Sequence, residues 1–384
     1  MERIRVGIIG MGMIGARHIE TLRRIGDVQI VAVSDQNYAL AQQKAEQFCI
    51  PKCYASAEEL IADPEIQVVH DCTPNHLHLE INSKIIKAGK HVFSEKPLGM
   101  TSAESAQMLE LLKEHPEVVA GVDFCYRMNA LVQDARYRIA KGEIGRPYLI
   151  HGSYLQDWLL FDTDYNWRID PSLSGESRCV ADIGSHWMDT AQVLAGCRIT
   201  EVCANTLTAL PVRKKPSRQV ETFAVNDDVQ REEIAVNTED YAGVLVKFAN
   251  GACGVFQCSQ VSAGRKNYID IEVDGSISSF HWQQETSDRM WKGNRDQNNE
   301  EIMRNPNLMD PEARKYATLP AGQPEGWNDA FRNTLDAYYS FIRSGKRQAG
   351  EACDFATFED GHYIAKLTEA ILKSAREKRW VTVE

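Results

Sequence analysis

The sequence predicts an α/β protein that opens with a doubly wound parallel sheet. Three observations support this prediction: short Val- and Ile-rich runs recur through the first third of the 384-residue chain, helix-like segments separate them, and a glycine-rich turn follows the first run. The runs do not alternate strictly between apolar and polar residues, as half-buried strands do. They therefore indicate central parallel strands that are covered by helices on both faces.

The expected strands are five runs within the first 123 residues. Two segments between them carry helix-start signals, because Ser56 precedes Glu59 by three residues and Thr101 precedes Glu104 in the same way. Both pairs are capping boxes, in which the hydroxyl and the carboxylate satisfy backbone N–H groups at the start of a helix. The five runs are VGIIG (6–10), QIVAVSD (29–35), IQVVHDCTP (66–74), GKHVFSEKP (89–97) and EVVAGVD (117–123).

The glycine-rich turn has the pattern GMGMIG, with Gly10, Gly12 and Gly15. A GxGxxG pattern alone is weak evidence, but this one follows a strand and opens a helical segment at 14–26. The first glycine permits the bend, the second lets the backbone approach a pyrophosphate, and the third lets helix and strand pack closely. The context predicts a dinucleotide site. The alternative is a tight turn in an α/β protein that binds no nucleotide.

Asp35 ends the second run, 20 residues after Gly15. A carboxylate at this position accepts hydrogen bonds from the ribose hydroxyls of the adenosine and repels a phosphate there. Since Gln36 and Asn37 follow, with no arginine, the sequence favours NAD over NADP as the cofactor.

Two further polar stretches follow strands at their carboxyl ends, where open α/β sheets bind ligands. They are TPNHLH (73–78) and the tripeptide Glu95-Lys96-Pro97. A lysine at this rim could orient a substrate hydroxyl and, as a cation, lower its pKa. The alternative is that Lys96 pairs with Glu95 or with solvent, as most lysines do. Spacing alone does not separate the two.

The stretch VADIGSHWMD (180–189) holds two aspartates and a histidine. If it is helical, spacings of four and three residues place Asp182, His186 and Asp189 on one face. A histidine suits the role of general base, because its ordinary pKa of about 6.5 lies near neutral pH. The alternatives are a core histidine with satisfied hydrogen bonds and, for Asp182, a helix cap.

The second half of the chain predicts a sheet with exposed connections. Asn-Gly and Asp-Gly turn signals divide the segments 241–260 and 267–282, so both predict β-hairpins. Amphipathic patterns predict helices over 328–345 and 361–380. Polar composition and weak periodicity predict exposed loops over 209–240 and 284–327.

Composition excludes several classes of function. Lys and Arg number 43 against 54 Asp and Glu, for a net charge of −11, and there is no basic run. This balance argues against a nucleic-acid partner and against an anionic membrane surface. No apolar stretch approaches the roughly 18 residues that a membrane span needs, and a cytoplasmic protein is expected. The ten cysteines are scattered, and their spacing does not suit zinc, so reduced thiols and no metal are expected.

Together these motifs resemble the Gfo/Idh/MocA family, the relatives of glucose–fructose oxidoreductase and inositol dehydrogenase. The resemblance spans nearly the whole chain. It implies a Rossmann domain over 1–123 and a second α/β domain over 124–384 with a large, mostly antiparallel open sheet. It also implies a homodimer or homotetramer that packs through one sheet face, and a final helix that can return toward the first domain. The motifs are GMGMIG, SD (34–35), TPNHLH, EKPLG (95–99), NWRIDPSLSG (166–175) and DIGSHWMD (182–189).

The resemblance also implies roles for individual residues. Lys96, Asp182 and His186 match the catalytic lysine, aspartate and histidine of the family. The residues expected at the cofactor are Gly10, Gly12, Met13, Ile14, Gly15, Asp35, Thr73, Asn75, His78, Glu95, Lys96, Trp167 and Arg168. The residues expected at the substrate are Lys96, Tyr126, Asp157, Trp158, Arg168, Asp182, His186 and Trp327.

These residues predict an NAD-dependent dehydrogenase that oxidises a secondary hydroxyl of a sugar, anhydrosugar, glycoside or cyclitol, or that reduces the corresponding ketone. His186 would take the hydroxyl proton while Lys96 polarises the same oxygen, and Asp182 would orient the imidazole or hold a neighbouring substrate hydroxyl. The Asp-, Tyr- and Trp-rich segment 154–168 suits a polyhydroxylated ring. Asp189 is expected to have a structural or substrate-edge role.

Two other classes in the family remain alternatives. Some relatives are glycosidases that use NAD with no net redox, and others are non-catalytic nucleotide-binding regulators. The intact Lys96, Asp182 and His186 argue against a regulator. Sugar-ring dehydrogenases of the family often contain LPAGHPEGW where this chain has LPAGQPEGW, so a substrate contact at Gln323 is not carried over.

Overall fold

The computed structural model describes residues 3–217, 230–349 and 351–384. By its internal contacts the chain forms two compact units. Unit 1 comprises Met1–Phe124 and Phe331–Ala365, and unit 2 comprises Cys125–Ala330 and Lys366–Glu384. Residues 331–365, which the sequence assigned to the second domain, therefore group with the first unit.

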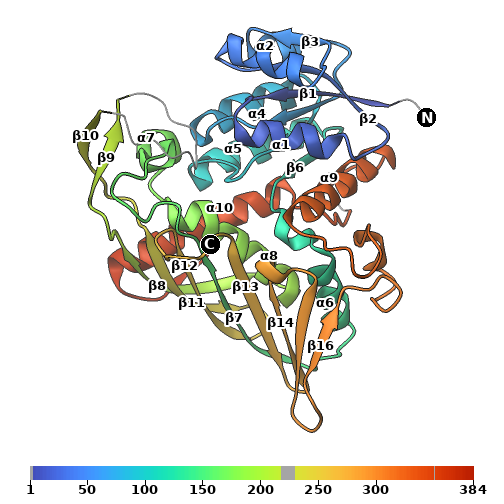
Figure 1. The fold of residues 1–384 in the computed structure, drawn as a ribbon, viewed down its shortest axis with the longest axis vertical. Helices are drawn as coiled ribbons and strands as arrows, with labels where there is room; N and C mark the ends of the chain where they lie inside the picture. The colour runs from blue at the N-terminus through green and yellow to red at the C-terminus, as the bar shows by residue number, and fades with distance from the viewer. Residues whose placement is uncertain (1–2, 218–229, 350) are drawn as a thin grey trace. The chain divides into compact units, whose positions relative to one another are not determined.

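Unit 1 contains a six-stranded sheet in the order β3-β2-β1-β4-β5-β6, and all neighbouring strands are parallel (Figure 1). The order reverses between β1 and β4, which is the point where doubly wound sheets bind ligands. The expected parallel sheet is confirmed, with one short edge strand, β3, outside the five expected runs. The strands are β1 (Ile4–Ile9), β2 (Val28–Ser34), β3 (Lys52–Tyr54), β4 (Val68–Asp71), β5 (His91–Ser94) and β6 (Ala120–Val122).

The helices between these strands begin where the sequence signals them. The Ser56 hydroxyl accepts a hydrogen bond from the Glu59 N–H at 3.2 Å, and the Thr101 hydroxyl accepts one from the Glu104 N–H at 3.1 Å. Both capping boxes therefore start helices. The helices are α1 (Met13–Leu22), α2 (Tyr38–Gln47), α3 (Ala57–Ala62), α4 (His78–Lys87) and α5 (Ser102–Glu114).

Unit 2 contains a nine-stranded sheet in the order β16-β15-β14-β13-β7-β12-β11-β8-β17. Only the β12–β7 pair is parallel, so the expected open, mostly antiparallel sheet is confirmed. Both expected hairpins form, as β11–β12 and β13–β14. The strands are β7 (Pro147–Leu155), β8 (Ile199–Leu207), β11 (Tyr241–Phe248), β12 (Cys253–Ser259), β13 (Tyr268–Gly275), β14 (Ser278–Gln283), β15 (Arg289–Asn294), β16 (Glu300–Met303) and β17 (Val381–Thr382).

One face of this sheet is covered by helix α8 (Ser185–Ala195). Its Trp187 stacks on Phe256 of β12 with ring centroids 4.4 Å apart, and its indole N–H donates to the Asp270 carbonyl at 3.0 Å. Helices α6 (Ala130–Ala140) and α7 (Pro171–Ser174) also belong to unit 2. The other sheet face carries alternate strand residues that are exposed or half-buried.

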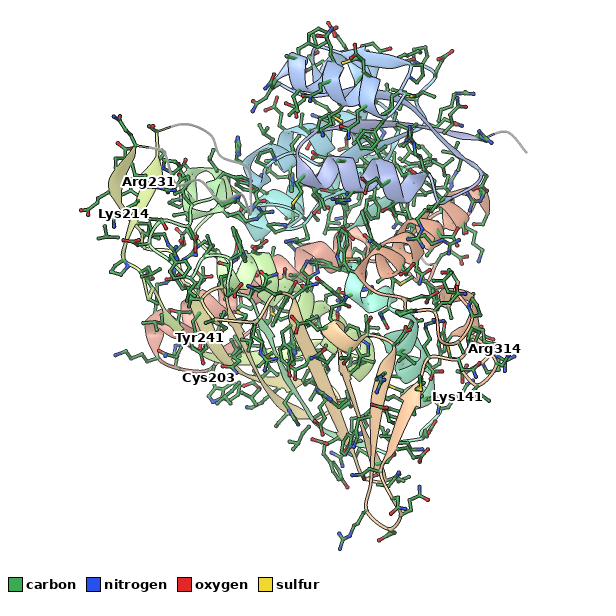
Figure 2. The ribbon with its side chains drawn as sticks, in the orientation of Figure 1. Lys141, Cys203, Lys214, Arg231, Tyr241 and Arg314 are labelled. Carbon is green, nitrogen blue, oxygen red and sulfur yellow. The ribbon has the colours of Figure 1, made fainter. Side chains whose placement is uncertain are left out.

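The expectation of loops over 209–240 and 284–327 is wrong in part. Strands β9 (Val212–Pro216) and β10 (Arg231–Ala235) form a separate two-stranded sheet, marked by Lys214 and Arg231 in Figure 2, and 218–229 lie outside the described residues. Strands β15 and β16 extend the large sheet at one edge. These strands are short and rich in charged residues, as edge strands are, so their sequences lack a long apolar alternation.

The two helices expected near the end of the chain are present as α9 (Trp327–Arg343) and α10 (Phe358–Glu377). Each of them spans residues of both units. Within the described ranges, no helix is both long and apolar enough to cross a bilayer. The ten cysteines all lie among the described residues and form no disulfide.

Candidate functional site

The glycine-rich turn between β1 and α1 has the geometry of a phosphate cradle. Gly10 has a φ of +93°, and a Cβ there would lie 2.5 Å from the Cys72 carbonyl oxygen. A Cβ at Gly15 would lie 2.0 Å from the Gly10 carbonyl oxygen. A Cβ at Gly12, which precedes the first residue of α1, would meet nothing within 4 Å. The first and third glycines are therefore required by packing, and the second leaves open space at a helix N-terminus that suits an anion.

Asp35 is held at the carboxyl end of β2 by the backbone of this turn. Its carboxylate accepts the Met11 N–H at 2.7 Å and the Asn37 N–H at 2.8 Å. Met13 is exposed and Ile14 is half-buried in the first turn of α1. The carboxylate is thus fixed beside the cradle, as a group that selects a ribose diol must be.

The stretch after β4 is tied to the loop after β5. The Thr73 hydroxyl donates to the Asp71 carboxylate at 2.6 Å. The two ring nitrogens of His78 lie 2.8 Å from the Thr73 carbonyl oxygen and 2.7 Å from the Pro97 carbonyl oxygen. His78 therefore joins the two loops, while Asn75 is buried in a single 3₁₀ turn between them.

Glu95 and Lys96 follow β5 at the same edge of the sheet. The Glu95 side chain is buried, and its carboxylate accepts the Lys96 backbone N–H at 3.2 Å and faces Nε2 of His18 at 3.1 Å. Burial raises the pKa of this carboxyl, but the hydrogen bond and charge of His18, together with Lys96, outweigh burial and hold the pKa below its ordinary value. Lys96 itself is half-buried, and its peptide bond to Pro97 is cis.

In unit 2 the stretch 180–189 is not one regular α-helix. Val180–Gly184 form a π turn, and α8 begins at Ser185. Asp182 therefore lies in the π turn, whereas His186 and Asp189 lie in α8, so the regular α-helix on which the expected shared face depended is not present over the whole stretch. A π turn adds one residue to the helical repeat, so it rotates Asp182 relative to His186.

Asp182 and His186 each have partners within unit 2. The Asp182 carboxylate accepts a hydrogen bond from the Gln260 side-chain amide at 2.9 Å and pairs with Nε of Arg168 at 3.2 Å. The His186 ring is 7% exposed and lies edge-on to the Tyr126 ring, with centroids 4.9 Å apart. Asp182 is thus held by an amide and a guanidinium, and the His186 ring packs against a tyrosine ring.

A hydroxyl cluster lies beside His186. Tyr126 and Tyr154 place their hydroxyls 2.8 Å apart, and both donate to the Asn267 side-chain oxygen, at 2.9 and 2.6 Å. Burial is the main cause that raises the pKa of Tyr154 well above its ordinary value, and the neighbouring Tyr126 and Asp182 raise it further. The Tyr154 hydroxyl therefore stays protonated and acts as a donor near neutral pH.

Asp189 has a structural partner. Its carboxylate accepts two hydrogen bonds from the Arg127 guanidinium, and both side chains are buried. This bidentate pair joins α8 to the segment before α6. The arrangement agrees with a structural role for Asp189.

The other expected substrate and cofactor residues of unit 2 have the following positions. Asp157 pairs with Lys266 at 2.7 Å, and the Trp158 indole donates to the Gln156 amide oxygen at 2.9 Å. The Arg168 guanidinium lies over the Trp167 ring at 4.5 Å. Trp327 is the half-buried first residue of α9, and Gln323 is exposed.

Sequence reasoning missed a buried charge network behind Asp182. Arg178 and Arg213 both pair with Asp240, and none of these three side chains is exposed. The Gln260 amide oxygen accepts from Arg178 at 3.3 Å while its nitrogen donates to Asp182. Burial raises the pKa of Asp240, but the two arginines outweigh it and lower the pKa. The network orients Gln260 and so the carboxylate of Asp182.

Two groups of described residues bring histidine and carboxylate ligand atoms within 4.8 Å of one another. One is His18, Glu95 and Asp123 in unit 1, and the other is His151, Glu272 and Asp274 in unit 2. In each group the histidine already faces a carboxylate, Glu95 at 3.1 Å and Asp274 at 3.1 Å. Hydrogen bonding thus accounts for both groups, and the absence of a metal stays a prediction.

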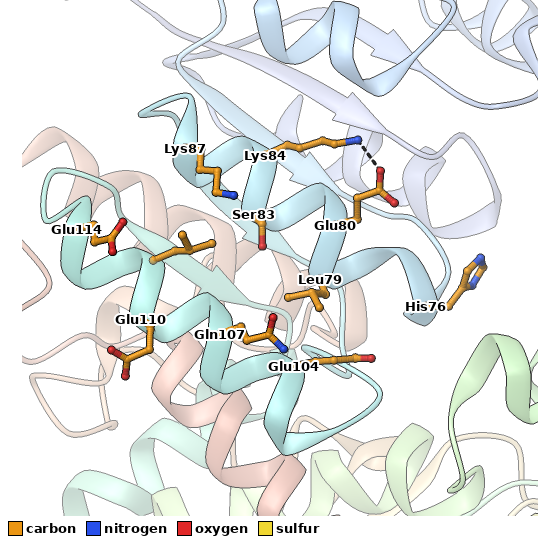
Figure 3. A pocket seen from close by; sticks show the side chains of 11 residues that line it. His76, Leu79, Glu80, Ser83, Lys84, Lys87, Glu104, Gln107, Glu110 and Glu114 are labelled. Atoms are coloured by element: carbon orange, nitrogen blue, oxygen red, sulfur yellow. Dashed lines mark hydrogen bonds and ion pairs between the residues drawn. The ribbon is translucent and has the colours of Figure 1, made fainter.

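A groove of about 540 Å³ lies between α4 and α5 (Figure 3). Its lining includes Glu104, Glu110 and Glu114 of α5 and a Glu80–Lys84 pair on α4. The excess of carboxylates would repel the phosphates of a nucleotide. The lining of this groove therefore suits a nucleotide less well than the glycine-rich turn does.

Comparison with known proteins identifies two conserved domain types in the chain. A family model described as "Oxidoreductase family, NAD-binding Rossmann fold" matches residues 4–124, and the C-terminal domain model of the same family matches residues 132–281. Levoglucosan dehydrogenase of Pseudarthrobacter phenanthrenivorans is 29% identical, over 100% of this chain and 99% of the relative. Myo-inositol 2-dehydrogenase of Thermotoga maritima is 26% identical, over 99% of both chains.

Solved structures agree with the sequence relatives. Levoglucosan dehydrogenase in complex with NADH and L-sorbose superposes with a TM-score of 0.88 at 28% identity, covering 100% of both chains. An inositol dehydrogenase homolog from Azotobacter vinelandii complexed with NAD⁺ gives a TM-score of 0.85 at 26% identity, covering 99% of this chain and 97% of that one. Both halves of the fold therefore have counterparts in these enzymes.

Proposed function

Because the chain belongs to the Gfo/Idh/MocA family of oxidoreductases, we propose that it is an NAD-dependent dehydrogenase that oxidises a secondary hydroxyl of a sugar, anhydrosugar, glycoside or cyclitol, or reduces the corresponding ketone. The observation that supports this most directly is the combination of an open glycine cradle in unit 1 with an Asp182–His186 set among hydroxyls and amides in unit 2.

Unit 1 supplies the groups that fit NAD. The cradle at Gly12 opens at the N-terminus of α1, where backbone N–H groups favour a pyrophosphate. The Asp35 carboxylate would accept the hydroxyls of the adenosine ribose and repel a 2′-phosphate. The nicotinamide of a bound NAD would supply the hydride acceptor for the carbinol carbon.

The proton chemistry belongs to the protein. His186 takes the proton of the substrate hydroxyl, and Lys96 polarises the same oxygen as a cation. The Asp182 carboxylate is held by Gln260 and Arg168, and its role in the proposal is to orient the imidazole or to hold a neighbouring substrate hydroxyl. No step requires a metal.

The polar groups of unit 2 suit a polyhydroxylated ring. Tyr126, Tyr154 and Asn267 form a hydroxyl–amide cluster, and Asp157 and Trp158 follow the same strand β7. Hydroxyl-rich substrates need several fixed donors and acceptors and a flat apolar surface for their C–H groups. Levoglucosan and myo-inositol, the compounds named in the relatives, are both of this class.

The test is a screen of purified protein with NAD against monosaccharides, anhydrosugars, glycosides and cyclitols, read as absorbance of NADH at 340 nm, with NMR of the product. We expect NADH and a ketone from at least one compound, and lower activity with NADP. Cleavage of a glycoside without net NADH would support the NAD-using glycosidase instead. NAD binding with no turnover of any compound would support a regulatory protein.

A further inference from the structure

Two histidines lie in the interior of unit 1. His18 of α1 and His70 of β4 have no exposed surface, and neither does Tyr339 of α9. Phe93 and Phe331 pack against the His18 ring, with centroids 6.0 and 4.8 Å away. Polar groups among aromatic rings are costly unless each has a hydrogen-bond partner.

Each of these side chains has such a partner, and the partners form one chain. Nε2 of His70 lies 2.7 Å from the Tyr339 hydroxyl, and Nδ1 of His70 lies 2.7 Å from Nδ1 of His18. Nε2 of His18 lies 3.1 Å from a carboxylate oxygen of Glu95. The chain therefore links α9, β4 and α1 to the end of β5.

The direction of the last hydrogen bond follows from charge. Burial raises the pKa of Glu95, but His18 and Lys96 outweigh burial and hold the pKa below its ordinary value, so this carboxyl is an acceptor. Nε2 of His18 must then donate a hydrogen bond to the Glu95 carboxylate. This holds for either placement of the proton that lies between the Nδ1 atoms of His18 and His70. Burial is the main cause that holds the pKa of His70 well below its ordinary value, and His18 lowers it further. His70 is therefore neutral, and it donates to one of its two partners, His18 and Tyr339, while it accepts from the other.

The second oxygen of Glu95 accepts the backbone N–H of Lys96 at 3.2 Å, and the Glu95 N–H donates to the Asp71 carbonyl at 2.8 Å. A rotation of the Glu95 side chain would break its bond to His18 and its bond to Lys96 together. The orientation of this carboxylate is thus coupled to the backbone at Lys96.

We propose that Tyr339, His70 and His18 form a buried positioning chain that fixes the Glu95 carboxylate and, through it, the backbone of Lys96. The proposal rests on the proposed function, in which Lys96 polarises the substrate hydroxyl. None of the three side chains touches the reacting atoms. They are positioning residues, and they act by determining the position of the Lys96 amine.

The chain offers a matched pair of variants for the test. Tyr338 is next to Tyr339 on α9, is equally buried, and donates its hydroxyl to the Val119 carbonyl at 3.1 Å. Tyr339→Phe and Tyr338→Phe each remove one buried hydroxyl, but only Tyr339→Phe removes the terminal partner of the chain that leads to Glu95. His18→Gln keeps a side-chain donor that can reach toward Glu95, and it serves as the conservative variant.

Two readouts are measured on full-length protein with confirmed cooperative unfolding. The first is kcat with NAD and the substrate found by the screen. The second is the rate of acetylation of Lys96 by acetic anhydride, followed by mass spectrometry. For Tyr339→Phe we expect kcat to fall about tenfold, less than the roughly 100-fold that a 1 Å misplacement can cost, and Lys96 acetylation to change at least about threefold. Tyr338→Phe should leave both within about twofold, and His18→Gln should lie closer to the wild type than His18→Ala.

The outcomes separate the two claims. Equal behaviour of Tyr339→Phe and Tyr338→Phe in the acetylation assay would overturn the positioning chain, and so would a loss of kcat in Tyr339→Phe with unchanged acetylation of Lys96. A wild-type protein with no turnover of any compound would overturn the proposed function. The acetylation comparison would still decide the positioning chain in that case, because it needs no substrate.

Discussion

Asp35 is the single residue that most directly controls cofactor choice. Its carboxylate is anchored by the Met11 and Asn37 N–H groups, so it cannot turn away from an incoming nucleotide without losing two hydrogen bonds. A fixed negative charge disfavours a 2′-phosphate by repulsion and favours a diol by accepting its hydrogen bonds.

We expect Asp35→Asn to lower the ratio of kcat/KM with NAD to kcat/KM with NADP at least about tenfold. The reason is that hydrogen bonds to charged groups contribute about 1.5–3 kcal/mol. The amide keeps the size of the side chain and one acceptor oxygen, so the cradle should persist. Steady-state rates with both cofactors measure the change. Glu301→Gln, at a surface pair with Arg289, is the control, and an unchanged NAD/NADP ratio in Asp35→Asn would contradict this role for the carboxylate.

At this scale the sequence predicted the residues whose function depends on local pattern. Gly10 and Gly15 are required by backbone geometry, Gly12 leaves open space at the helix N-terminus, and the GxGxxG spacing predicts both properties. It could not predict that Gln260 would orient Asp182, because the two are 78 residues apart and only strand pairing brings them together. The expected cofactor role of Arg168 stays a prediction, since its observed partner is Asp182.

At the scale of elements, the sequence predicted strands and helices with regular periodicity and missed the irregular ones. The π turn at Val180–Gly184 was missed because its residues also fit an α-helix. A Cβ at Gly184 would lie 3.3 Å from Sγ of Cys258, so the turn lies close against β12. The buried chain from Tyr339 to Glu95 was missed for another reason, because it joins α9, β4 and α1 to the loop after β5.

The face of the nine-stranded sheet opposite α8 exposes apolar side chains that have no evident role in a single chain. Leu149, Leu245 and Val255 face outward on neighbouring strands and are 47–48% exposed, and Trp291 is 37% exposed. A central row of the same face runs through His151, Glu272 and His281. Exposed apolar residues around a polar row are typical of a protein interface.

We expect this face to pack against a second copy of the chain, as the family resemblance implies. Light scattering after gel filtration should give the mass of a dimer or tetramer for the wild type. Leu245→Asp combined with Val255→Asp should weaken association at least about 100-fold, because each buries an unpaired charge. Leu308→Asp, at a residue 74% exposed and not on this sheet, is the control. A monomeric wild type, or a double variant that assembles normally, would contradict the expectation.

Across the whole molecule, the two units have different tasks in the proposed function. Unit 1 has the six-stranded parallel sheet and the nucleotide cradle, and unit 2 has the Asp182–His186 set with its hydroxyl cluster. Because the proposed base, His186, belongs to unit 2 and the nucleotide cradle belongs to unit 1, loss of the base should leave cofactor binding intact.

The most direct test is the rate of NADH formation by His186→Asn with the substrate found by the screen, together with NADH binding by fluorescence. The account predicts a fall in kcat of between about 100- and 10,000-fold, the usual contribution of a general base, with NADH affinity unchanged. His115→Asn, at the end of α5, should behave as the wild type. A His186→Asn protein that keeps kcat within about tenfold of the wild type would contradict His186 as the base.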